Sequence, residues 1–155
     1  MDFIVSRVAM SVCALLVVGV LAGVVDIPQF EEPNAELSDI VDDLCRIAEE
    51  VAGSCAEVEL VWTVPSLVSG ETVRLTIASE LILAGCAGSK AVARPSCDIH
   101  LWDWDGSMLN RSRVDALDAL SAPLQASSGD LIMLESIGVE YEDLLRSMLF
   151  VRRAG

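Results

Sequence analysis

Two aspartates, Asp103 and Asp105, stand one residue apart directly after the apolar stretch 99–102 and just before Gly106. A pair of carboxylates at the end of a strand can divide the work of catalysis, because one can attack phosphorus while the other moves a proton. Their types and spacing make Asp103 and Asp105 the candidate catalytic residues of the chain.

The segment IHLWDWDGSMLNRS, residues 99–112, resembles motif I of the haloacid-dehalogenase-like phosphatases, an apolar strand followed by Asp-x-Asp-Gly-Thr/Ser. The resemblance implies a nucleophilic Asp103, an acid–base Asp105 and a magnesium ion. The rest of the family's pattern is missing. Only about fifty residues follow Gly106, too few for a doubly wound parallel sheet, and the single lysine, Lys90, precedes the motif. Because Asp-x-Asp-Gly is also an ordinary turn sequence, we predict a chain that is not an enzyme and uses no cofactor.

Metal binding is also weakly indicated. Asp103, Asp105, Ser107 and Asn110 offer oxygen ligands for calcium, but their spacing departs from the EF-hand loop and no ligating glutamate follows. The only histidine, His100, has no metal partner in the sequence and no identifiable nucleophile. We therefore predict a solvated turn and a histidine on a surface or strand edge, with no metal site.

Three tryptophans could form a ligand platform. Trp62 belongs to an alternating apolar set, so we expect it in the core, while Trp102 and Trp104 flank the aspartate pair.

Five cysteines define the redox chemistry. Cys13 lies in an apolar run and is expected to act as a small hydrophobe. An even number of further cysteines in a small extracellular domain suggests two disulfides, and Cys45–Cys55 with Cys86–Cys97 close the shortest loops. The alternatives are the two other pairings or four unpaired thiols. A zinc site is poorly supported because the sequence has no C-x-x-C pair.

Asn110-Arg111-Ser112 is an N-glycosylation sequon. Asn110 is therefore a candidate glycosylation site, usable only if this segment lies outside the cell.

Composition excludes some partners. The net charge of -14 repels phosphate backbones and anionic headgroups, so we expect no nucleic-acid partner. The chain is nevertheless 53% hydrophobic, with a mean hydropathy of +0.52, so its apolar residues must be concentrated in part of the sequence.

That part is residues 8–25, VAMSVCALLVVGVLAGVV, which carry no charge. At about 1.5 Å per residue, a helix of this length nearly covers the hydrocarbon core of a bilayer, about 30 Å thick. We predict a retained single-pass transmembrane helix that makes the lipid bilayer a partner. A secretory signal cleaved after Ala22 and a buried core helix are the alternatives.

The flanking charges set the direction. Arg7 precedes the run, while Asp26, Glu31 and Glu32 follow it, and no lysine or arginine occurs again before Arg46. The positive-inside rule then places the N-terminus in the cytoplasm and residues 26–155 outside the cell.

The remaining sequence predicts an α+β domain. We expect a hydrophobic segment at 1–25, a linker at 26–33 and an extracellular domain at 34–155, β-rich with an antiparallel sheet and one amphipathic helix at 34–52. Alternation predicts strands at 57–64 and 72–77 that pair as a hairpin. Further expected elements are strands at 81–84, 98–104 and 131–134, a loop at 85–97, a short helix at 112–120 with Leu120 facing inward, and a segment 144–151 that could be helix or strand.

The overall plan resembles small euryarchaeal membrane-anchored, type IV pilin-like surface proteins. The N-terminal SRVAMSVCALLVVGVLAGVVD, the segment VWTVPSLVSGETVRLTI and the closing LFVRR carry this resemblance. It implies a hydrophobic helix followed by a β-rich head. The chain departs from pilins at two points, since Ser6-Arg7 precedes Val8 without the small residue of a pilin signal, and 8–25 lacks the early glutamate of bacterial pilins.

These observations favour a non-enzymatic subunit or accessory component of a surface filament or secretion apparatus, able to form homo-oligomers. Small residues at Gly19, Ala22 and Gly23 would let neighbouring helices approach closely. The alternative is a monomeric anchored ectodomain that binds a ligand or partner.

Overall fold

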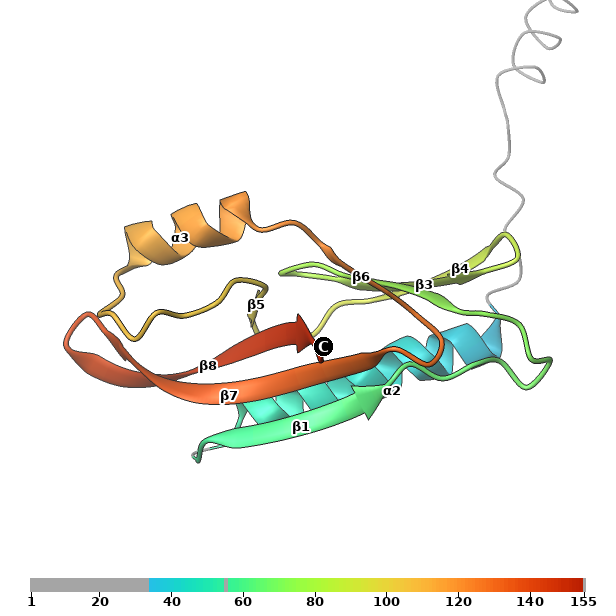
Figure 1. Ribbon diagram of the computed structural model, residues 1–155, viewed down its shortest axis with the longest axis horizontal. Coiled ribbons are helices and arrows are strands. Elements are labelled where there is room, and N and C mark those ends of the chain that lie inside the picture. Colours follow the sequence, from blue (N-terminus) through green and yellow to red (C-terminus); the bar gives the residue numbers. More distant parts are fainter. Residues whose placement is uncertain (1–33, 55, 155) are drawn as a thin grey trace, which may run out of the picture. The chain divides into compact units, whose positions relative to one another are not determined.

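The structure is a computed structural model that describes residues 34–54 and 56–154. These residues form two helices and eight strands, and the strands make two four-stranded sheets, called here sheet A and sheet B (Figure 1).

Helix α2, Ala35–Ala52, begins where the sequence predicts it. Asn34 caps it, because its side-chain oxygen accepts a hydrogen bond from the Glu36 N–H at 3.1 Å. The helix ends at Gly53, whose N–H donates to the Glu49 carbonyl. Its apolar face is buried through Leu37, Val41, Leu44, Cys45, Ala48 and Val51.

Sheet A has the order β1-β7-β8-β5. Its strands are β1 Val58–Thr63, β7 Leu131–Tyr141, β8 Leu144–Arg153 and β5 Ile99–His100. The neighbours are antiparallel except for the short β5, which runs parallel to β8. The β7–β8 hairpin is therefore the backbone of this sheet.

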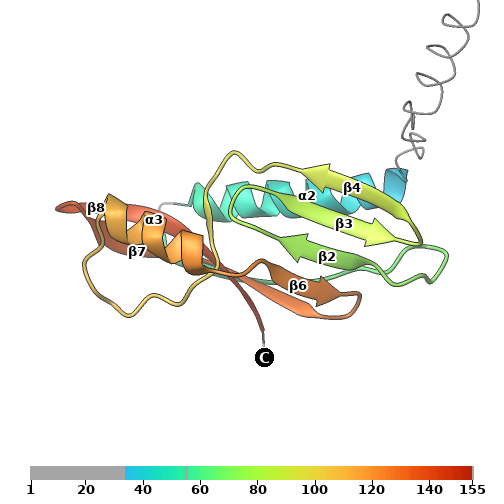
Figure 2. The same ribbon diagram turned by 90° about the horizontal axis from the view of Figure 1, so that it is seen from above.

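Sheet B has the order β4-β3-β2-β6 and is antiparallel throughout. Its strands are β4 Ser89–Ala93, β3 Ile82–Cys86, β2 Arg74–Ile77 and β6 Leu124–Ser127. Figure 2 shows these strands side by side, with α2 running along the β4 side.

Both sheets contribute to one main core around α2. The helix contacts β3 and β4 of sheet B and β1, β7 and β8 of sheet A. Buried residues from each sheet, such as Leu75 and Ile82 of sheet B and Leu134 and Val151 of sheet A, join the apolar face of α2 in a single cluster. The helix thus holds the two sheets together.

The second helix, α3 Arg111–Leu120, covers the end of the β7–β8 hairpin away from sheet B (Figures 1 and 2). A smaller cluster forms there from Leu109, Val114, Val139, Met148 and Phe150. The domain accordingly has two cores that share the β7–β8 hairpin.

The predicted fold class is wrong for the described residues. Instead of one antiparallel sheet with one helix, they form two sheets, one of them mixed, and two helices. Neither described helix is long and apolar enough to span a bilayer. The helix expected at 8–25 lies outside the described residues.

The predicted hairpin between 57–64 and 72–77 is also wrong. Strand β1 pairs with β7, and β2 pairs with β3 and β6 in the other sheet. The connection carries the buried Val64, Leu67 and Val73, so it packs in the core while it crosses between the sheets.

Other boundaries shift. The expected loop at 85–97 contains β4, joined to β3 by a turn in which Ala87 and Gly88 have positive φ. The strand expected at 98–104 is only Ile99–His100, and 144–151 is strand β8. Helix α3 forms as predicted, but Leu120 is 84% exposed because the helix ends beyond the hairpin core.

The β7–β8 turn is strained, since Glu142 and Asp143 have φ of 48° and 65°. Two-residue hairpin turns favour Asn-Gly at such positions, and a residue with a Cβ costs about 1–2 kcal/mol in this region. We expect Asp143→Gly to raise the free energy of unfolding by about 1 kcal/mol relative to Asp143→Ala, measured by urea denaturation. Both variants remove the same charge, so an Ala variant as stable as the Gly variant would contradict strain at this turn.

Candidate binding site between helix α3 and strand β8

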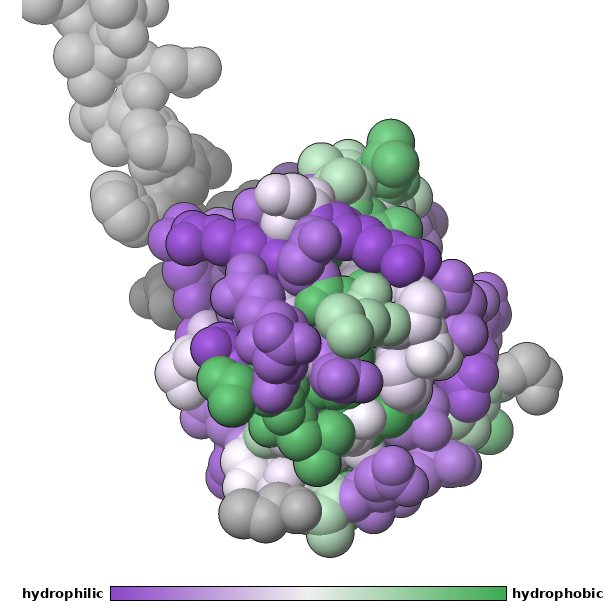
Figure 3. All heavy atoms as spheres, turned by 90° about the vertical axis from the view of Figure 1, so that its left-hand side faces the viewer, coloured by the Kyte–Doolittle hydropathy of each residue, from purple (hydrophilic) through white to green (hydrophobic). Residues whose placement is uncertain are grey.

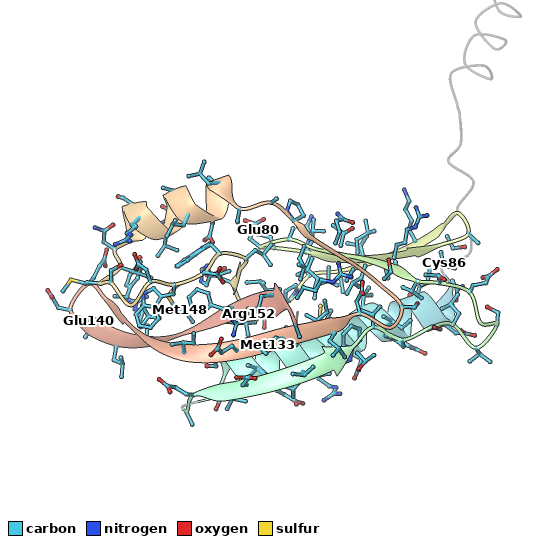
Figure 4. All side chains as sticks on the ribbon, in the orientation of Figure 1. Glu80, Cys86, Met133, Glu140, Met148 and Arg152 are labelled. Atoms are coloured by element: carbon cyan, nitrogen blue, oxygen red, sulfur yellow. The ribbon has the colours of Figure 1, made fainter. Side chains whose placement is uncertain are left out.

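Helix α3 is positioned by its cap and by its inner face. The Asn110 side-chain oxygen accepts a hydrogen bond from the Arg113 N–H at 2.9 Å, which starts the helix. Val114 then packs with Met148 and Phe150 of β8. Figure 4 shows Met148 in the space between β8 and α3.

A hydrogen-bonded trio joins α3 to sheet A. The Asp118 carboxylate lies 2.9 Å from His100 Nδ1 and accepts a hydrogen bond from Trp102 Nε1 at 2.7 Å. His100 is only 5% exposed. Because a carboxylate oxygen accepts, Nδ1 of His100 carries the hydrogen of this contact.

The His100 ring has one hydrogen-bond partner and a cavity beside it. Asp118 is the only described side chain that bonds to the His100 ring. His100 is one of the residues that line a cavity beside α3. The ring therefore borders a space that water or a ligand can enter.

Aromatic contacts fix the ring. The centroids of Trp102 and Phe150 lie 5.1 Å apart in an edge-on arrangement, and the His100 ring is 5.6 Å from each. Such packing limits the rotation of all three rings, so the imidazole of His100 is held in place.

The space in question is a cavity of about 690 Å³ between α3 and the β8 side of sheet A. Ala52 at the end of α2 and Leu149 of β8 contribute to its wall. Volumes of this order enclose small ligands or short peptide segments. Its charged lining residues are Glu80, Asp98, Asp115, Asp118, Arg111 and Arg146.

The two arginines are partly engaged. The Arg146 guanidinium carbon lies 4.7 Å from the centre of the Tyr141 ring. Arg111 approaches Asp115 only to 3.9 Å, and both side chains are largely exposed. Four carboxylates against two guanidinium groups give the cavity an acidic character, which favours cationic groups in a bound molecule.

The aspartate pair that resembles a phosphatase motif lies outside the lining of this cavity. Asp103 and Asp105 lie exposed in the loop 101–110. Asp105 accepts hydrogen bonds from the Ser107 hydroxyl and N–H and from Arg113, and these hold its pKa below the usual value. The pair thus forms the predicted turn, and the described residues contain no group of three or more His, Cys, Asp or Glu placed to hold a metal ion.

Three candidate disulfide cysteines are free thiols. Cys86 donates a hydrogen bond to Glu71 at 3.5 Å, at the end of the domain opposite the hairpin tip (Figure 4), and no Cys86–Cys97 bond is present. Cys97 lines the cavity and Cys45 lies in the core. Cys45, the predicted partner of Cys55, is a free thiol, while Cys55 and Cys13 themselves lie outside the described residues.

Burial raises the pKa of the Cys45 thiol to about 11, with smaller contributions from Glu49, Asp42 and Cys97. Cys97 packs against the same core cluster that contains Cys45, which the preferred pairing did not anticipate.

The other candidate residues are distributed over the domain. Asn110, the sequon residue, is exposed at the start of α3, where its oxygen is used as a cap. Trp62 packs against the main core as predicted, whereas Trp102 and Trp104 pack on the smaller cluster and do not form a surface platform. His100 is on the edge strand β5 but is buried, which corrects the surface alternative.

The sequence did not indicate which charged residues share the cavity with His100. Asp118, Arg146 and Glu80 come from three distant segments. The only local signal was the spacing of Arg111, Asp115 and Asp118, which repeats every three or four residues and so places them on one side of a helix.

Comparisons with protein families, with curated proteins and with solved structures find no match to this chain. Function is therefore inferred from the cavity and its lining residues.

Removal of the Asp118 carboxylate should destabilise the domain. Asp118→Ala leaves His100 Nδ1 and Trp102 Nε1 without their acceptor, and we expect a loss of about 1–3 kcal/mol in urea denaturation. Asp118→Asn keeps an acceptor oxygen and should lose less. The matched control, Asp115→Ala, removes a carboxylate of the same helix whose side chain is 70% exposed, and should stay within about 0.5 kcal/mol. An Asp118→Ala variant as stable as this control would contradict a stabilising role for the hydrogen bonds between Asp118, His100 and Trp102.

The Cys45 thiol should make stability fall at high pH. Its pKa is raised from 9.0 to about 11 in the fold, so the folded state holds the proton more tightly. The resulting stabilisation is complete below pH 9 and disappears as the pH rises to about 11. Urea denaturation under reducing conditions should show a smaller decline over this range in Cys45→Ala than in the unmodified chain. Parallel declines would show that Cys45 does not titrate differently in the fold.

Proposed function

We propose that this chain is a non-enzymatic, membrane-anchored surface protein that acts by binding a partner in the cavity between α3 and β8. The uncharged run 8–25 would anchor it in the cell membrane, with the N-terminus in the cytoplasm and the domain 34–155 outside. This role matches an accessory subunit of a surface filament or secretion apparatus.

The cavity is the observation that carries this proposal. Its volume of about 690 Å³, its mixed charges and the oriented His100 ring are the features of a recognition site. Recognition sites are often built from residues on rigid elements with a few fixed polar groups. Here the packed rings of His100, Trp102 and Phe150, together with α3, supply that rigidity.

Binding explains the site better than catalysis does. A catalytic histidine works on a neighbouring hydroxyl or thiol, or on a water held against substrate. Among the described residues, the His100 ring bonds to no side chain other than Asp118. A fixed ring beside carboxylates suits a partner that brings cationic groups.

A pilin-like structural subunit is the second candidate. Helix α2 follows the apolar run after a short linker, and both sheets cover its apolar face, so the helix forms the spine of a β-rich head. Under this hypothesis, Gly19→Leu with Gly23→Leu should disturb filament assembly by preventing close helix contacts. Unchanged filaments in sheared-cell preparations would count against it.

A site-directed photo-crosslinking experiment tests the main proposal. The full chain would be produced in its native cells with p-benzoylphenylalanine at position 115, on the cavity wall, or at position 92, on the outer face of sheet B. Val92 is 57% exposed and lies outside the cavity lining, so it is the matched control. We expect crosslinked complexes only from position 115, and only in the membrane fraction.

Equal crosslinking from both positions, or none from position 115, would contradict partner binding at the cavity. Recovery of the full-length chain outside the membrane fraction would contradict the anchor, independently of the crosslinking result.

A further inference from the structure

One edge of β8 has no strand beside it over half its length. Strand β5 pairs with β8 only at Leu149 and Phe150. The preceding residues 144–148 pair with β7 on one side, and no described strand pairs with them on the other. Leu145 and Ser147, on this stretch, are exposed.

The backbone groups of Leu145 and Ser147 point toward that open edge. Ala154 directly follows β8, and its N–H donates to the carbonyl of Leu131 at the start of β7. This pair continues the antiparallel register of the two strands, in which every second residue of β8 bonds to β7. The even-numbered residues of β8 therefore bond to odd-numbered residues of β7. The Leu109 N–H donates to the Glu140 carbonyl on the far side of β7, which agrees with this parity. In an antiparallel pair the orientation alternates, so Leu145 and Ser147 direct their N–H and C=O groups away from β7.

The cavity lies along this same edge. Arg146, Ser147 and Met148 line it from β8, while Asp115 of α3 and Asp98, just before β5, line it from other elements. An added strand would sit about 4.8 Å from β8, in the row that β5 occupies further along. The open edge and the cavity are therefore one feature.

The apolar contacts of such a strand are also available. Leu144 and Leu145 are 60% and 80% exposed. Figure 3, which looks at the hairpin end of the domain, shows hydrophobic residues gathered among hydrophilic ones. Successive residues of a strand point to opposite faces, so Leu144 shares the α3 face with Met148 and Leu145 lies on the other face. An extended segment could place alternate side chains on Leu145 and the remaining ones beside Leu144 and the acidic wall.

The charges identify the occupant. Glu80, Asp98, Asp115 and Asp118 outnumber Arg111 and Arg146 in the cavity. A second copy of the chain would bring a net charge of -14 to this acidic site, which disfavours self-association. The chain's own segment 26–33 carries three carboxylates and two prolines, which suit neither the charge nor a strand.

The geometry points to strand addition: an extended, basic segment of another protein pairs with the β8 edge at Leu145 and Ser147, against the carboxylates of the cavity. This inference rests on the proposed binding function and specifies its partner.

A defined peptide tests it. The probe is a blocked seven-residue peptide that alternates lysine with valine or threonine, measured by fluorescence anisotropy against the full chain in neutral detergent micelles. Two control peptides carry either glutamate in place of lysine or N-methyl groups on alternate backbone nitrogens. We expect binding of the lysine peptide, weakened by salt, and at least about tenfold weaker binding of both controls, the loss that one hydrogen bond or ion contact causes.

Variants of the edge supply matched pairs. Ser147→Pro removes the outward N–H, whereas Ser147→Ala keeps it; both lose the 2.6 Å contact between the Ser147 and Ser136 hydroxyls. Proline is tolerated on an outward-facing edge position, and near-UV circular dichroism would verify folding. Leu145→Pro with Leu145→Ala repeats the comparison. Each proline variant should bind the peptide about tenfold more weakly than its alanine partner.

Equal affinities of the proline and alanine variants, or of the N-methylated peptide, would overturn strand addition. Equal binding of the glutamate peptide would overturn the basic partner. Self-association of the full chain that Ser147→Pro abolishes would identify a second copy as the occupant and also overturn it. If these tests fail while crosslinking from position 115 persists, only this inference falls; loss of both removes the proposed function as well.

Discussion

The apolar face of α2 is the constraint on which the rest of the domain depends. Six of its residues are buried, and a single small sheet would leave part of this stripe in water. Two sheets therefore share the helix: β3 and β4 cover it from sheet B, and β1, β7 and β8 cover it from sheet A. The chain must leave β1, cross through the connection 64–73, anchored by the buried Val64, Leu67 and Val73, and start the second sheet before it can return to β7.

The second core follows from the length of the last hairpin. Strands β7 and β8 are the longest in the domain and extend past their outer neighbours. Val139 of β7 lies beyond the end of β1, and Met148 of β8 lies beyond the end of β5. Loop 101–110 and α3 bury these residues. Because β5 contributes only two residues to the sheet, α3 lies beside an unpaired stretch of β8 and a cavity remains there. The cavity is thus a consequence of how the hairpin is covered.

Local patterns in the sequence predicted elements better than partners. The cap at Asn34, the stripe of α2 and the alternation in β1 were readable because each involves residues close in sequence. Alternation reports which side chains share a face of a strand, but it carries no information about the neighbouring strand, so β1 was assigned to β2 and not to β7. Strand β4, in GCAGSKAVARPSC, was missed because its glycines and proline are typical of a loop. The Asp118–His100 contact had no local signal, since its residues lie eighteen positions apart in different elements.

An open strand edge is usually a liability, because unpaired N–H and C=O groups invite pairing with further copies of the same chain. In this domain the groups of Leu145 and Ser147 lie beside an acidic cavity and not on a flat exposed edge. Two copies approaching each other through this edge would bring their carboxylates together, and the net charge of -14 adds a longer-range repulsion. The same carboxylates would attract a basic strand. The charge distribution that keeps copies of the chain apart therefore also selects the segment that can pair with it, so solubility and specificity arise from one set of side chains.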